Sequence, residues 1–162
     1  MEQILFIAFG AIAVGGAIMV VTRRHPMSSA LFLILTLFAV AALFVLRQAH
    51  FLAAIQVIVY AGAVVVLFIF VIMLINVPES RLPLERLTGF RFLGIIVAGL
   101  LILETALVAR RFVTPGTPTA DSGSVEVVGR ALFTDYLLAF EITSVLLLAA
   151  VIGAIALAKK KI

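Results

Sequence analysis

The feature that most constrains this chain is a series of five apolar stretches, each long enough to cross a lipid bilayer. A helix needs about 20 mainly apolar residues to span the hydrocarbon core. Because 65% of the residues are hydrophobic and only 12% are charged, a water-soluble domain of this size could not cover its apolar side chains. We therefore expect an all-α membrane protein, a single domain over residues 1–162, whose transmembrane helices cover residues 3–21, 27–46, 51–77, 92–109 and 136–158.

Two longer polar links interrupt the predicted spans. Residues 78–91 are broken by Pro78 and Pro83, and residues 110–135 contain several prolines, glycines and acidic side chains. The second link is too polar for lipid and too short for a catalytic domain. Within it, Val125–Phe133 is predicted to form a short helix lying on the membrane surface.

The distribution of arginine and lysine predicts the orientation of the chain. With five spans, the two termini lie on opposite sides of the membrane. The side that holds the N-terminus has four of these residues, Arg47, Arg110, Arg111 and Arg130. The opposite side has eight, Arg23, Arg24, Arg81, Arg86, Arg91, Lys159, Lys160 and Lys161. Since cytoplasmic loops carry the excess of positive charge, we expect the N-terminus outside and the C-terminus in the cytoplasm.

Composition excludes several classes of site. The chain has no cysteine, so it cannot form disulfides, thiolate-bound zinc sites or iron–sulfur clusters by itself. Its two histidines, His25 and His50, lie near predicted membrane boundaries rather than at helix-ligand spacing. The formal charge of +4 comes from residues that flank the spans, and no basic–aromatic stripe suited to nucleic acid is present.

Two features indicate that the chain works with partner proteins. Small residues, which let helices approach closely in lipid, are spaced four apart in the first span (Ala11/Gly15, Ala13/Ala17) and in the last (Ala149/Gly153, Ala150/Ala154/Ala158). The middle of every span is almost free of charge, and no internal repeat is evident. A self-sufficient transporter needs converging polar groups near the middle of the membrane, so this chain lacks the parts to transport ions alone.

The third span carries the most informative residues. Gln56 and Tyr60 are four apart, which places them on one face of a regular helix. Tyr60 lies near the bilayer midplane, where a phenol needs a hydrogen-bond partner. Gly62 follows, within a run of β-branched residues that weakens regular α-helical geometry. The segment can host a π-bulge, a feature frequent at functional positions. Alternatively, Gly62 only admits a neighbouring helix to which Tyr60 bonds.

Two acidic residues lie inside predicted spans, Glu104 and Glu141. Each is five residues from the end of its span, so both are expected in the outer third of the membrane at similar depth. They can belong to a proton path or pair with Arg110, Arg111 or Arg47. The alternative is that both carboxylates extend to the outer interface.

Three segments together resemble subunit J of bacterial NADH–quinone oxidoreductase, the counterpart of mitochondrial NADH dehydrogenase subunit 6. They are His25–Leu31 (HPMSSAL), Phe51–Ala63 (FLAAIQVIVYAGA) and Val66–Phe68 (VLF). The resemblance covers about residues 23–76, and the five-helix layout agrees over the remainder. Many members of that family have methionine where this chain has Val65.

The resemblance implies a core, non-catalytic membrane subunit of respiratory complex I with no active site of its own. Other chains would carry FMN, the iron–sulfur clusters and the quinone site, so no cofactor is expected here. The implied partners are small multispan subunits, the quinone-site subunit, antiporter-like subunits and the lipid bilayer. In this family the stretch that corresponds to Tyr60–Gly62 forms and relaxes a π-bulge, which is thought to gate a water path. The absence of a transit peptide favours a bacterial cytoplasmic membrane.

Two other functions remain open from the sequence. The chain could be a subunit of a multi-chain cation/proton antiporter or a small independent transporter, which predicts transport without NADH oxidation. It could also be a purely structural scaffold, in which case Tyr60 and Gly62 would tolerate conservative changes.

Overall fold

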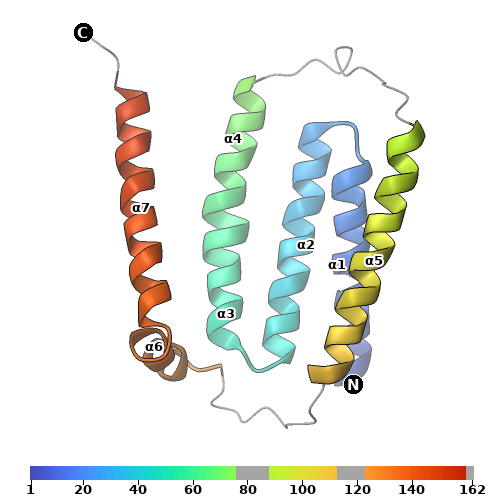
Figure 1. The fold of residues 1–162 in the computed structure, drawn as a ribbon, viewed down its shortest axis with the longest axis horizontal. Helices are drawn as coiled ribbons and strands as arrows, with labels where there is room; N and C mark the ends of the chain where they lie inside the picture. The colour runs from blue at the N-terminus through green and yellow to red at the C-terminus, as the bar shows by residue number, and fades with distance from the viewer. Residues whose placement is uncertain (76–87, 113–122, 160–162) are drawn as a thin grey trace.

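The computed structural model describes residues 1–75, 88–112 and 123–159, and these form helices joined by short turns (Figure 1). The third span consists of three consecutive pieces, of which the middle one, η1, is a π-helix. The elements are α1 (Glu2–Thr22), α2 (Pro26–Leu46), α3 (His50–Ile55), η1 (Gln56–Val64), α4 (Val65–Ile75), α5 (Thr88–Phe112), α6 (Val125–Phe133) and α7 (Leu137–Ala158). No strand occurs in the described residues, and five helices are long and apolar enough to cross a membrane. The predicted fold class is therefore confirmed.

The predicted boundaries agree closely with the observed ones. The first, second and last spans differ from prediction by one residue at most at either end, and α6 covers the predicted range. The third span begins at His50, whereas its predicted end at residue 77 lies outside the described residues. In the fourth span, helix α5 begins at Thr88 and ends at Phe112, beyond both predicted ends, whereas its apolar window of Leu93–Arg110 differs from the predicted 92–109 by one residue at each end. Residues 78–87 and 113–122 of the two predicted polar links also lie outside the described residues.

Helix α2 packs between α1 and the third span, and small residues make this possible. The buried apolar side chains are nearly all alanines, with Val65 as the largest: Ala30, Ala39, Ala41, Ala53, Ala61 and Val65. Gly16 is buried in α1, and a Cβ built on it would collide with the side chain of Thr36 in α2. Ser29 of α2 also donates a hydrogen bond to the backbone oxygen of Val20 in α1. Close approach of small surfaces is the usual basis of helix association in lipid.

Helices α5 and α7 stand at opposite sides of this three-span unit (Figure 1). In the described residues, the apolar stretches of α5 and α7 that could span a membrane contain no buried residue. Large apolar side chains are exposed along both helices, for example Leu101 on α5 (58%) and Leu148 on α7 (61%). This apolar surface therefore has to be covered by lipid or by other chains.

Helix α6 lies across the foot of α7, as Figure 1 shows. The side chain of Ser124 caps its first turn by accepting a hydrogen bond from the Val127 amide at 3.4 Å. The rings of Phe133 and Phe140 pack in a tilted arrangement with 5.0 Å between their centroids, which joins α6 to α7. The starts of α1 and α7 lie at one end of the bundle, and the last residues of α7 lie at the other (Figure 1). Which end faces the cytoplasm stays a prediction.

Candidate functional site

The π-helix η1 occupies the middle of the third span, where the sequence allowed an irregular turn. At its start, the Gln56 amide bonds to the carbonyls of Leu52 and Ala53, as in regular and tighter helical turns. At its end, the Val65 amide bonds to the carbonyls of Gly62 and Tyr60, the latter five residues earlier. A bond to the residue five before is the defining π-helical bond. The backbone therefore carries an irregular segment between two regular helical pieces.

The residue types in η1 explain why its backbone leaves α-helical geometry. Isoleucine and the valines are branched at Cβ, and glycine is among the weakest helix formers, so α geometry is only weakly favoured here. Gly62 also has a steric reason to be glycine. A Cβ built on it would lie 3.2 Å from the carbonyl oxygen of Val57, five residues earlier in the same helix. The π-helical form therefore accommodates glycine at this position better than any larger residue.

The two polar residues of the site are not equivalent. Gln56 is half-buried, whereas the Tyr60 side chain is 53% exposed. Residues four apart stack on an α-helix, but the wider turn of a π-helix moves them out of register. Among the described residues, neither side chain has a hydrogen-bond partner, and no other helix approaches the Cβ position of Gly62. The proposed neighbour that Gly62 would admit is thus not another described helix of this chain.

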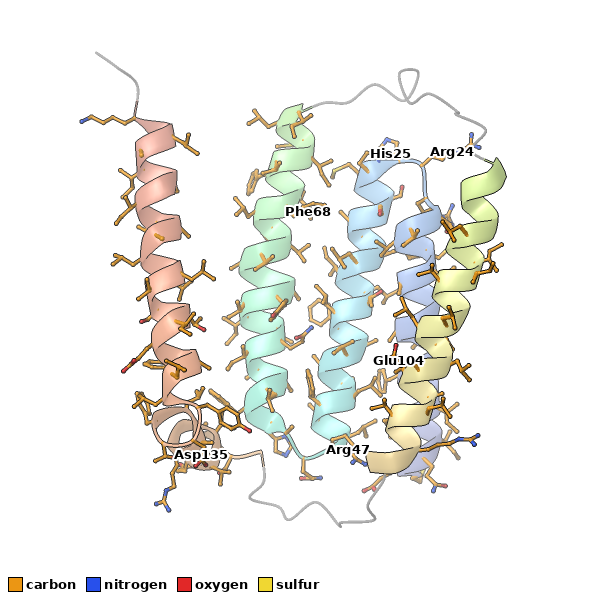
Figure 2. All side chains as sticks on the ribbon, viewed as in Figure 1. Arg24, His25, Arg47, Phe68, Glu104 and Asp135 are labelled. Carbon is orange, nitrogen blue, oxygen red and sulfur yellow. The ribbon has the colours of Figure 1, made fainter. Side chains whose placement is uncertain are left out.

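The acidic residues Glu104 and Glu141 lie on different sides of the molecule. Glu104 is on α5 and Glu141 is on α7, and these helices flank the bundle at opposite sides (Figures 1 and 2). Both side chains are exposed. Within the described part of the chain, neither carboxylate is paired with an arginine, so the expected pairings with Arg47 and Arg110 do not form there. The side chain of Arg111 lies outside the described residues.

Possible metal ligands do not gather in the described ranges. Residues 1–75, 88–112 and 123–159 contain no cluster of three or more histidine, aspartate or glutamate side chains that could hold a metal ion. His25 lies at the turn between α1 and α2, and His50 begins α3 at the opposite end of the bundle (Figures 1 and 2). Among the described residues, the irregular backbone of η1 is therefore the feature that the candidate site rests on.

Comparisons with known proteins agree on one family. The family model of NADH-ubiquinone/plastoquinone oxidoreductase chain 6 matches residues 16–157. The chain is 41% identical to NAD(P)H-quinone oxidoreductase subunit 6 of the organellar chromatophore of Paulinella chromatophora, over 98% of this chain and 78% of that protein. It is 37% identical to NAD(P)H-quinone oxidoreductase chain 6 of a Nostoc species, over 99% and 82%. It is 35% identical to NADH-quinone oxidoreductase subunit J of Escherichia coli K12, over 94% and 84%.

Proposed function

The chain belongs to the chain 6, or subunit J, family of NADH-quinone oxidoreductases, and we propose that it couples quinone reduction to proton translocation. In this proposal it is a core membrane subunit without an active site of its own, and η1 is the moving part. The observation that carries the proposal is the π-helix in the middle of the third span. A π-helical turn holds one more residue than an α-helical turn, and such turns are frequent at functional positions.

Relaxation of η1 to an α-helix would turn α4 relative to α3. Removing one residue from the turn rotates everything after it by about 100°, because an α-helix has 3.6 residues per turn. Phe68, labelled on α4 in Figure 2, is 48% exposed and would swing to a different neighbour. A side chain of this size that moves by a quarter turn can open or close a water-filled path beside the helix. This is the physical basis of the proposed gate.

The residues where η1 meets α4 would let this rotation occur at a small cost in free energy. Val65 is almost fully buried, with 2% of its surface exposed, whereas Val64 beside it is 51% exposed. Loss of the extra residue would bring Val64 into the place that Val65 now fills. Because both are valine, the buried volume stays the same, and isosteric exchange of apolar side chains costs little. Two registers of similar packing are what a reversible two-state element needs.

The large exposed surface of α5 and α7 supports an assembly of several chains. In this proposal the neighbours are small multispan subunits, the quinone-site subunit and antiporter-like subunits of respiratory complex I, in a bacterial cytoplasmic membrane. FMN, iron–sulfur clusters and quinone would be bound by those other chains. The relatives reported above are named as quinone oxidoreductase subunits, and no observation favours the antiporter or independent-transporter alternative.

A substitution at Gly62 tests the proposal in the assembled complex. Gly62→Leu places a branched side chain against the Val57 carbonyl and should disfavour the π-helical register. We expect proton translocation driven by NADH to fall severalfold while electron transfer from NADH to a soluble acceptor is unchanged. Gly99→Leu is the matched control, since a Cβ at Gly99 on α5 meets no described atom. Both variants need native-gel evidence of intact assembly.

Unchanged proton translocation in an intact Gly62→Leu complex would remove the gating role. If Tyr60→Phe were also silent, the scaffold alternative would be left as the better account. Loss of electron transfer to the soluble acceptor would point to damaged assembly, and the smaller change Gly62→Ala would then replace Gly62→Leu in the same assay.

A further inference from the structure

A cavity of about 380 Å³ lies where α1 begins and α2 ends. It is separate from η1 and takes no part in the proposed gate. Its lining residues come from both helices: Glu2, Gln3, Phe6, Ile7, Leu46 and Arg47. The two helices pack together along their length, with Gly16 of α1 against Thr36 of α2 and with the hydrogen bond from Ser29 to the Val20 carbonyl.

Charged side chains lie at the membrane-boundary end of the cavity, and apolar side chains, its floor, line the rest. Glu2 and Arg47 carry opposite charges and are both exposed, and among the described residues no salt bridge joins them. Phe6 and Ile7 lie one to two turns deeper along α1. Leu46 is the last residue of α2, and Arg47 follows it (Figure 2). Polar groups therefore lie at the membrane boundary, and apolar groups extend from them into the hydrocarbon region.

We propose that this cavity binds the headgroup and upper acyl chain of a zwitterionic phospholipid, namely phosphatidylethanolamine. The Arg47 guanidinium would bind the phosphate, because its planar array of donors matches phosphate oxygens. The Glu2 carboxylate would bind the ammonium group, and the Gln3 amide can bond to the ester or phosphate oxygens. The acyl chain would lie against Phe6, Ile7 and Leu46. Two opposite charges that do not pair with each other complement a headgroup that carries both.

The location supports a lipid rather than a soluble ligand. Both charged residues flank predicted membrane spans, which is the level of phospholipid headgroups. A soluble zwitterion would leave the apolar floor uncovered. A neighbouring protein helix is the other occupant to consider, and the experiment below distinguishes it from a lipid.

Photolabelling in the assembled complex tests the proposal. The complex would be reconstituted in phosphatidylcholine vesicles that contain either photoactivatable phosphatidylethanolamine or photoactivatable phosphatidylglycerol. After illumination, mass spectrometry would map the labelled peptides. We expect phosphatidylethanolamine to label residues 2–7 and 46–47. Arg47→Gln should abolish this label, and Glu2→Gln should remove the preference for phosphatidylethanolamine over phosphatidylglycerol. Arg110→Gln is the matched control, because Arg110 lies at the same end on α5 but lines no part of this cavity.

Two results would overturn the proposal. One is equal labelling of the wild type and the Arg47→Gln variant in intact complexes. The other is the absence of label from residues 2–7 and 46–47 in the wild type, which is the result expected if a helix of another subunit fills the cavity. Because none of these readouts involves proton translocation, failure here would leave the proposed gate untouched, and failure of the gate would leave the lipid site untouched.

Discussion

The backbone of Gly123 lies directly against Ala49, so that a Cβ on Gly123 would come within 2.5 Å of the Ala49 Cα and 2.7 Å of the Gln48 carbonyl oxygen. Gly123 comes just before α6, and Ala49 precedes the first residue of α3. Gln48 adopts a left-handed backbone conformation, with φ of 60°, which is uncommon for a residue other than glycine. The contact joins the segment before α6 to the turn from which the third span starts.

Replacement of Gly123 by alanine should loosen the start of the third span. The new methyl group would meet backbone atoms, which cannot move away as a flexible side chain can, and overpacking of this kind costs about 1–3 kcal/mol. We expect amide hydrogen exchange at His50–Ala54 to quicken by roughly tenfold in the assembled complex, since about 1.4 kcal/mol corresponds to a factor of ten.

Gly129→Ala is the control for this change. Gly129 lies inside α6, and a Cβ there meets no described atom. Because alanine favours a helix over glycine by up to about 1 kcal/mol, exchange at His50–Ala54 should not quicken in this variant. Equal effects of the two substitutions would mean that the contact with Ala49 does not hold the turn in place.

The interface between α1 and α2 depends on the absence of a side chain at Gly16. Gly16→Val would push against Thr36, whose hydroxyl is fixed by a hydrogen bond of 2.9 Å to the Phe32 carbonyl. We expect a marked loss of assembled complex on native gels, with little loss for Gly15→Val, because a Cβ at Gly15 meets no described atom. Normal assembly of the Gly16→Val complex would contradict the close packing of α1 on α2.

Val64, the last residue of η1, and Val65, the first residue of α4, provide a test of the register change itself. Val64 would become buried only after η1 relaxes to an α-helix. The substitution Val64→Ala removes side-chain volume from this position. The relaxed state should therefore lose about 1–2 kcal/mol relative to the π-helical state. We expect the rate of proton translocation to fall by several-fold. Val66→Ala should stay close to wild type, because residue 66 does not move into the buried position that Val65 now occupies. Similar rates for both variants would argue against the proposed exchange.

We expect Glu104 and Glu141 to differ in their importance for proton translocation, because they lie at different depths in the membrane. Glu104 lies six residues before Arg110, the end of its spanning window, so it is about 9 Å inside at helical rise. Glu141 is four residues after Leu137, or about 6 Å inside. The shallower carboxylate can reach the interface, whereas the deeper one needs a polar partner within the membrane.

We therefore expect Glu141→Gln to leave proton translocation near wild type and Glu104→Gln to lower it severalfold. Both would be measured as NADH-driven acidification in vesicles of the intact complex. Comparable losses in the two variants would show that depth does not separate their roles.

Much of this fold could be predicted from the sequence, because span length and turn residues are local properties. The range of α6 follows from its apolar and polar pattern. Glycine among β-branched residues allowed an irregular turn in the third span but did not decide between it and a regular helix that admits a neighbour at Gly62. The faces that pack together could not be predicted. In a helix that is apolar on all sides, such as α7, hydrophobicity does not distinguish a lipid-facing side from a buried one.

The remaining differences between prediction and structure come from the arrangement of the helices and from the π-helical register of η1. Glu104 and Glu141 seemed comparable because their distances along the chain are similar, but α5 and α7 lie at opposite sides of the bundle (Figure 1). The stacking of Gln56 on Tyr60 assumed an α-helix, and the π-helical register changes it. The contact of Gly123 with Ala49 and the cavity between Glu2 and Arg47 join residues far apart in sequence, for which no local pattern gives a signal.

The register of the Tyr60–Val65 backbone, compared between resting and turning-over complex, tests the central claim most directly. High-resolution structures of the intact complex in both conditions would resolve the acceptor of the Val65 amide. We predict the bond to the Tyr60 carbonyl in one condition. In the other, we predict a regular bond to Ala61 with Val64 in the place of Val65 and α4 rotated by about 100°. An identical π-helix in both conditions would contradict the account.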